Sequence, residues 1–165
     1  MRINKSMSLL LKDINIREIS PIKHYPIWQK KDKNGRPYWG VGHFCSFDPH
    51  GNLEEQDLSQ LEWDGNEVYK ETEKQEELPL ILMETIGIMK AWKETLEKDY
   101  SDVSFYIFAS FDNGDELVNR EEFEFWASTT LRFWAPRNRN TVINLDNFDD
   151  WKQPAILIEC NFPTV

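Results

Sequence analysis

The chain has 165 residues, 40% of them hydrophobic, so it is long enough for one domain with a substantial core and too short for two full domains. Its formal net charge of -10 excludes a nucleic-acid backbone or an anionic membrane surface as the main partner and favours a basic one. We therefore expect a single domain over residues 1–165.

The first residues do not predict a targeting segment. The longest apolar run there is 9–11, which is shorter than the core of a signal peptide and far from the roughly 20 residues of a spanning helix. The two cysteines, Cys45 and Cys160, are fewer than a disulfide-dependent secreted domain usually carries. We expect both to be buried thiols, and the protein to be cytoplasmic.

The first third of the chain predicts strands. Residues 13–19 alternate in polarity, which is typical of a short strand. Residues 25–30 and 36–47 flank a polar loop that contains an Asn-Gly pair, and this pattern predicts a hairpin. In the second arm, Gly40 and Gly42 share one face and leave room for another backbone or a bulky side chain.

The middle of the chain changes from strand to helix. Residues 53–61 fit a short helix, and 62–77 form an acidic, exposed connection with a strand around 67–72. Residues 78–98 then repeat apolar side chains at helical spacing, so they predict a long amphipathic helix. Gly87 in its interior costs about 1 kcal/mol relative to alanine.

Two apolar and aromatic runs follow the helix. Residues 103–111 are β-branched and aromatic and end at an Asp-Asn-Gly-Asp turn, so they predict a central strand. Residues 121–135 fit helical spacing at five positions. However, apolar residues and one threonine occupy every odd position from 123 to 135, which is the spacing of a strand. We favour a strand there, with a helix as the alternative.

The last part of the chain returns to the sheet. Residues 136–140 predict a loop, 141–145 a short strand, 146–153 a turn or short helix, and 155–162 a well-covered strand. The expected fold is therefore α+β, a mainly antiparallel sheet of about five or six strands with one long helix, residues 78–98, packed on a face.

The residue types of catalytic and metal sites do not form a recognisable pattern. His43, Cys45, Asp48 and His50 are close in sequence, but they lack the paired spacing of a zinc site. There is no Gly-x-Ser-x-Gly elbow and no glycine-rich phosphate loop. We expect no catalytic residue, no metal and no cofactor.

Carboxylates are instead concentrated in two segments with little apolar content, one before the long helix and one at the turn between the aromatic runs. Exposed charge of this kind acts mainly on the rate of association with a partner of opposite charge. The alternative is that this surface charge only keeps the protein soluble and binds no partner. The predicted contact residues are Glu67, Glu71, Glu73, Glu76, Glu77, Asp112, Asp115 and Glu116.

In its size, its acidity and its mixed order of strands and helix, the whole chain resembles the immunity proteins of contact-dependent inhibition and other bacterial polymorphic toxin systems. The resemblance carries over no individual residue. It implies a protein that binds and inhibits a cognate basic toxin, in many systems one that degrades nucleic acid, through an acidic surface with aromatic anchors.

The alternative is a small cytoplasmic hydrolase or ligand-binding enzyme. Such an enzyme needs a pocket, here between sheet and helix, in which polar groups converge. A binding protein needs surface acids and aromatic side chains instead.

Overall fold

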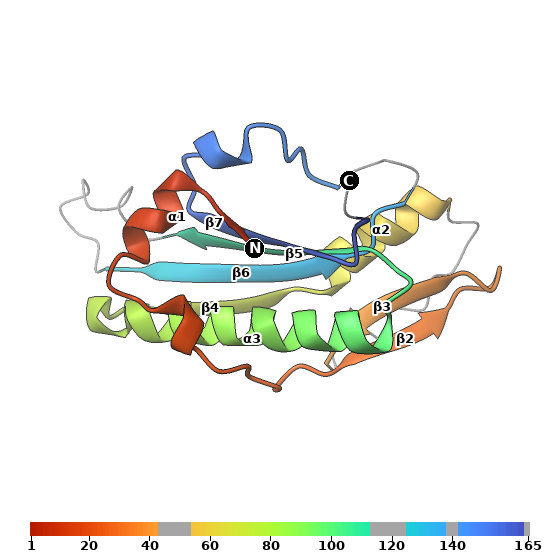
Figure 1. The fold of residues 1–165 in the computed structure, drawn as a ribbon, viewed down its shortest axis with the longest axis horizontal. Coiled ribbons are helices and arrows are strands. Elements are labelled where there is room, and N and C mark those ends of the chain that lie inside the picture. Colours follow the sequence, from red (N-terminus) through yellow and green to blue (C-terminus); the bar gives the residue numbers. More distant parts are fainter. Residues whose placement is uncertain (43–53, 113–124, 138–141, 164–165) are drawn as a thin grey trace.

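The computed structural model describes residues 1–42, 54–112, 125–137 and 142–163 (Figure 1). Its strands are β1 (Arg2–Ile3), β2 (Ile27–Lys31), β3 (Pro37–Val41), β4 (Val68–Thr72), β5 (Phe105–Asp112), β6 (Ala127–Trp134) and β7 (Ala155–Cys160). Its α-helices are α1 (Lys5–Leu10), α2 (Glu55–Gly65) and α3 (Leu78–Asp99), and short 3-10 helices lie at Ile16–Glu18, Gln75–Glu77 and Phe148–Asp150.

Five strands form an antiparallel sheet in the order β1-β7-β5-β6-β4, and β2 pairs with β3 in a separate two-stranded sheet. The helix α3 runs across one face of the large sheet (Figure 1). The predicted α+β class, the antiparallel sheet, the central position of β5 and the long helix are therefore confirmed. The predicted hairpin is also present over its described part, β2 and β3, but it forms a sheet of its own, and residues 43–47 of its second arm lie outside the described residues.

The second aromatic run is a strand over its described part. In β6, Leu131 and Phe133 face α3 and belong to the main core, whereas Thr130 and Arg132 lie on the opposite face and are half-buried. This alternation could not be maintained on a helix, because a helix would place neighbouring odd positions on different sides. Residues 121–124 of the predicted strand lie outside the described residues.

The helix α3 buries the apolar stripe that its periodicity predicted. Trp92 is 2% exposed, and its ring lies 5.2 Å from that of Phe133 in an edge-to-face arrangement. Its indole Nε1 donates to the carbonyl of Tyr25 at 3.0 Å, so the polar atom of this buried ring is satisfied. The stripe packs against β5, β6 and β7, which makes the interface between helix and sheet the main core.

The predicted strand over residues 13–19 is wrong. This segment is a strap, residues 13–22, which crosses the outer side of α3 and includes a 3-10 turn. The side chain of Asn15 accepts the N–H of Arg17, and Lys90 Nζ donates to the carbonyls of Ile16 and Ile19 at 2.6 Å each. The lysine supplies donors that a neighbouring strand would otherwise have supplied, so the strap needs no sheet.

Two more predictions near the ends of the chain change. Residues 142–145 are not a strand, because their apolar side chains pack as a loop on the face of the sheet opposite α3. The elements β1 and α1 were not predicted; they form because the buried Asn4 caps α1 at Met7 N and also accepts Ala155 N on β7.

Two glycines are explained by close contacts. A Cβ at Gly40 would lie 2.0 Å from the indole of Trp28, which confirms that this face of the hairpin makes room for a bulky side chain. A Cβ at Gly87 would lie 2.8 Å from Ile22 in the strap, and the carbonyl of Gly87 accepts the N–H of Ile22 at 2.9 Å. Gly87 therefore lets the strap approach α3, which outweighs its low helix propensity.

The helix α2 begins at Glu55 and continues to Gly65, past the predicted end. Glu62, which we expected in an exposed connection, is 2% exposed and forms a bidentate ion pair with Arg137, with N–O distances of 2.7 and 3.0 Å. Its carboxylate also accepts Trp39 N of β3 and Ala135 N, which directly follows β6. Glu62 thus connects the hairpin to the large sheet.

Replacing Trp92 by alanine should destabilise the protein strongly. The change empties a fully packed site between α3 and β6, and such truncations cost about 3–5 kcal/mol. Urea unfolding followed by circular dichroism measures the effect. Leu80→Ala is the matched control, because Leu80 lies on the same helix and is 59% exposed. An unchanged midpoint in Trp92→Ala would contradict the packing.

Replacing Glu62 by glutamine should also destabilise the fold, because it leaves the Arg137 charge without its counter-charge. Breaking a buried pair from one side costs about 3–5 kcal/mol, and replacing both partners by apolar residues costs much less. The double variant Glu62→Gln with Arg137→Met should be more stable than Glu62→Gln alone, because it removes the uncompensated charge and keeps a side-chain oxygen for the N–H groups of Trp39 and Ala135. Glu97→Gln, which removes an exposed pair with Lys93, should change the unfolding midpoint little.

Candidate functional site

The face of the large sheet opposite α3 has two halves. Over β7 and β5 it is covered by residues 142–151, whose Phe148 and Trp151 pack on Phe108. This covering segment lies on the other side of the sheet from α3 (Figure 1). Toward β6 and β4 the same face carries exposed and half-buried polar side chains instead. The second half is where predicted contact residues meet.

An acidic–aromatic patch, defined as Glu67, Tyr69, Glu71, Asp112 and Trp126, occupies this second half together with the end of β5. Glu71 on β4 and Asp112 on β5 pair in register with the same residue of β6, Ser128, from its two sides. Two strand spacings separate them, about 10 Å. The fold thus brings together two carboxylates that are 41 positions apart in the sequence.

Glu71 lies at the centre of the patch. Its Oε2 accepts the hydroxyl of Tyr69 at 2.9 Å and the indole N–H of Trp126 at 3.3 Å. Tyr69 is 46% exposed and Trp126 is half-buried, so both rings contribute to the surface while the carboxylate fixes their polar ends. Among the described residues, Oε1 of Glu71 has no hydrogen-bond donor and can accept one from a ligand.

The electrostatics of the patch act on Tyr69. Burial raises the pKa of its hydroxyl, and the carboxylates of Glu71 and Asp112 raise it further, while a hydrogen bond with Ser128 opposes the increase. Glu67 at the edge of the patch forms an ion pair with Arg132, whose guanidinium lies over the ring of Trp63 at 4.8 Å. The side chain of Glu67 is therefore partly neutralised.

The other predicted contact residues lie elsewhere. Glu73 and Glu76 are exposed near the start of α3, and Glu77 is half-buried there. Lys74, which donates to Glu77 at 2.8 Å, and Thr72 lower the pKa of the Glu77 carboxyl. Asp115 and Glu116 lie outside the described residues. Of the eight predicted acids, the patch contains Glu67, Glu71 and Asp112.

Tyr69 and Trp126 were missed as site residues. Tyr69 lies in the predicted strand around 67–72, of which we named only acids as contact residues; it is exposed, whereas Val68 beside it is buried. The alternation of β4 is the signal that could have separated them, because Val68 and Thr72 face α3 and Tyr69 must then face away.

The metal and nucleophile candidates do not form a site in the described part of the chain. His43, Cys45, Asp48 and His50 lie outside it, and within it no group of three or more His, Cys, Asp and Glu side chains is arranged to hold a metal. Cys160 is buried as predicted, and burial raises the pKa of its thiol to about 12. A thiol with this pKa stays protonated at neutral pH and is a poor nucleophile.

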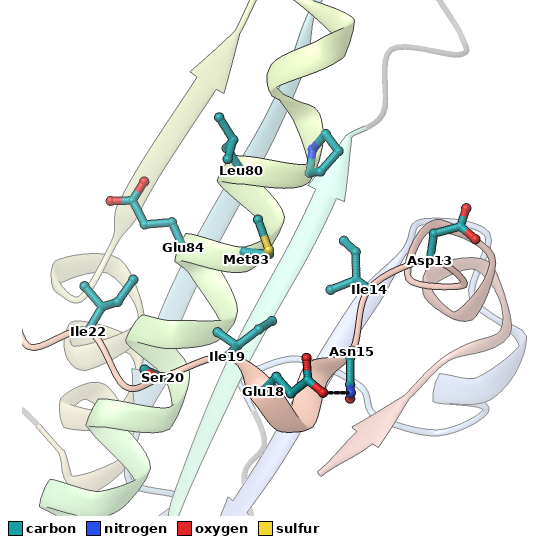
Figure 2. A pocket seen from close by; sticks show the side chains of 11 residues that line it. Asp13, Ile14, Asn15, Glu18, Ile19, Ser20, Ile22, Leu80, Met83 and Glu84 are labelled. Atoms are coloured by element: carbon teal, nitrogen blue, oxygen red, sulfur yellow. Dashed lines mark hydrogen bonds between the residues drawn. The ribbon is translucent and has the colours of Figure 1, made fainter.

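A groove of about 620 Å³ lies between the strap and the first turns of α3 (Figure 2). It is on the outer side of the helix, whereas the space between helix and sheet is filled by the main core. Its lining is largely apolar, with carboxylates at the margin. It therefore differs in position from the pocket that the alternative enzyme hypothesis expects.

Comparison with protein-family models, with curated proteins and with solved structures finds no match to this chain. Within the described ranges, no helix is both long enough and apolar enough to cross a membrane.

The patch geometry can be tested through Tyr69. Replacing Glu71 by glutamine and Asp112 by asparagine should lower the pKa of the Tyr69 hydroxyl toward its usual value, because two nearby negative charges disfavour the phenolate. NMR titration of the tyrosine rings measures this pKa, and Tyr69→Phe identifies the signal. The same pair of changes at the exposed acids Glu94 and Asp102 should leave it unchanged.

Proposed function

We propose that this protein binds and neutralises a basic protein toxin, in the manner of an immunity protein, and that the acidic–aromatic patch forms part of the contact surface. The observation that carries the proposal is the arrangement around Glu71, where an exposed tyrosine and a tryptophan are held beside a carboxylate with an accepting oxygen. Aromatic rings and desolvated charge pairs are the groups that dominate binding energy at protein interfaces.

The overall charge supports a basic partner. Of the 165 residues, 29 are acidic and 19 are basic, so the field of the whole molecule attracts cations over long distances. A toxin that acts on nucleic acid carries a basic cleft for its substrate, and an acidic surface can occupy that cleft. The charge then gives rapid association, while the rings of the patch contribute the short-range contacts.

The rigidity of the patch supports the same function. Glu71 and Tyr69 lie on β4, and Asp112 lies at the end of the central strand β5. Hydrogen bonds between the strands fix their relative positions before a partner arrives. A surface that is already ordered loses little conformational entropy on binding, so more of its contact energy appears as affinity.

The test starts from the partner. Co-purification from the source cells, combined with inspection of the neighbouring genes for a toxin, identifies the partner. The purified partner is then mixed with the protein in a stopped-flow instrument at several ionic strengths. A double variant, Glu71→Lys with Asp112→Lys, should associate about tenfold more slowly at low salt and show a weaker salt dependence, because it reverses the local charge.

The matched control is Glu94→Lys with Asp102→Lys, which makes the same change in net charge at exposed acids outside the patch. It should slow association less. Equal slowing by both double variants would leave only a general charge effect and would contradict a role for the patch. An acidic partner, or a partner whose activity persists in the complex, would contradict the proposed function.

A further inference from the structure

A second surface lies on the other side of β4 from the patch. The α3–strap groove, already described as the hollow of about 620 Å³, is bounded by the first turns of α3 and by the strap (Figure 2). Lys70 of β4 forms an ion pair with Glu84, one of the residues that line the groove, 2.6 Å away. The two faces of the edge strand β4 are therefore connected to different surfaces, one to the patch directly and the other to the groove through Glu84.

The groove is preformed because the strap is fixed to α3. Lys90 holds the 3-10 turn of the strap through two carbonyls, and Ile22 N donates to the carbonyl of Gly87. The close approach at Gly87 brings the strap down on the helix at this end, whereas nearer the start of α3 the two separate. A rigid hollow of this size is in the range of ligand sites, roughly 300–1,000 Å³.

The walls of the groove are apolar and incompletely covered. Leu80 is 59% exposed, although the opposite face of its helix is packed in the core. Met83 and Ile19 are half-buried and line the hollow from its two sides, together with Ile14, Ile22 and Pro79. Apolar surface of this kind gains free energy when a ligand covers it, at about 25 cal/mol per Å².

The charges at the margin define the ligand. Asp13, Glu18 and Glu84 line the groove, and no lysine or arginine is among its lining residues. Glu84 is neutralised by Lys70, and Asp13 has only an exposed lysine 3.9 Å away. Glu18 accepts a hydrogen bond from Asn15 at 2.7 Å but forms no ion pair within the described part of the chain. The margin is therefore complementary to positive charge.

We propose that the α3–strap groove binds an amphipathic segment of a protein, with apolar side chains against Leu80 and Met83 and lysine or arginine beside Glu18 and Asp13. This inference rests on the proposed function in one respect, namely that the segment belongs to the same basic partner. The apolar side chains come from both walls and the three carboxylates are spread around them, which is the arrangement of helix-in-groove recognition.

The binding test uses synthetic peptides and does not require the partner. The probe is an amidated peptide of about 18 residues with leucines on one helical face and lysines on the other. A scrambled peptide of the same composition lacks the apolar face, and a third peptide has glutamate for lysine. By fluorescence anisotropy, we expect the probe to bind at least about tenfold more tightly than either control peptide.

The position of binding is measured by amide NMR. Shifts should be confined to residues 13–22 and 79–84. Leu80→Ser should weaken probe binding about tenfold, since it removes an exposed apolar side chain from the lining of the hollow. Leu9→Ser is the matched control, because Leu9 is 73% exposed on α1 and does not line the groove. Glu18→Lys should weaken binding more than Glu94→Lys, because Glu94 is an exposed residue of α3 that does not line the groove.

Several results would overturn the inference. They are equal binding of the probe and the scrambled peptide, absence of binding, NMR shifts at the patch instead of the groove, or equal effects of Leu80→Ser and Leu9→Ser. Once the partner is identified, Leu80→Ser should increase its dissociation rate. Probe binding at the groove with no change in that rate would refute the assignment to this partner. A partner sensitive to Leu80→Ser but not to the patch variants would refute the patch alone.

Discussion

The buried carboxylate of Glu62 is the interaction on which the arrangement of the two sheets depends. It accepts backbone N–H groups from both sides of the gap between β3 and the end of β6, and the guanidinium of Arg137 compensates its charge. At the C-cap of α2, Asn66 donates to the carbonyls of Trp39 and Phe133, again one from each sheet. These two side chains supply the hydrogen bonds between the sheets that direct strand pairing would otherwise supply, and they fix the position of the hairpin relative to the large sheet.

Much of the fold could be predicted because periodicity alone determines it. The stripe of α3 and the alternation of β6 each record which face is buried, and the structure buries those faces. Glu62 could not be predicted in the same way, because nothing in its neighbourhood distinguishes it from the other acids of α2. Its burial depends on Arg137, which is 75 positions away. The strand predicted over residues 13–19 was wrong for a related reason, since carbonyls of this segment are satisfied by Lys90 on α3, which is distant in the sequence.

The candidate site shows the same division. Exposure of Glu71 and Asp112 followed from the low apolar content around them, and both are exposed. Their proximity depends on the order of strands β4, β6 and β5, which no local pattern contains. The position of Trp126 beside Glu71 required that register as well, whereas the exposure of Tyr69 follows from the alternation of β4 alone. Charge in a segment can be read from composition, whereas a constellation of side chains depends on topology.

The position of β4 at the edge of the sheet has a consequence for how this surface can vary. Alternate residues of the strand serve different surfaces, with Tyr69 and Glu71 on the patch and Lys70 directed to the margin of the groove. A substitution at one position alters one surface and leaves the other unchanged. Insertion or deletion of a single residue in β4 would instead exchange them, turning the lysine into the patch and the carboxylates toward α3. Point substitution can therefore adjust the two surfaces separately, whereas a change in the length of this strand would lose both together.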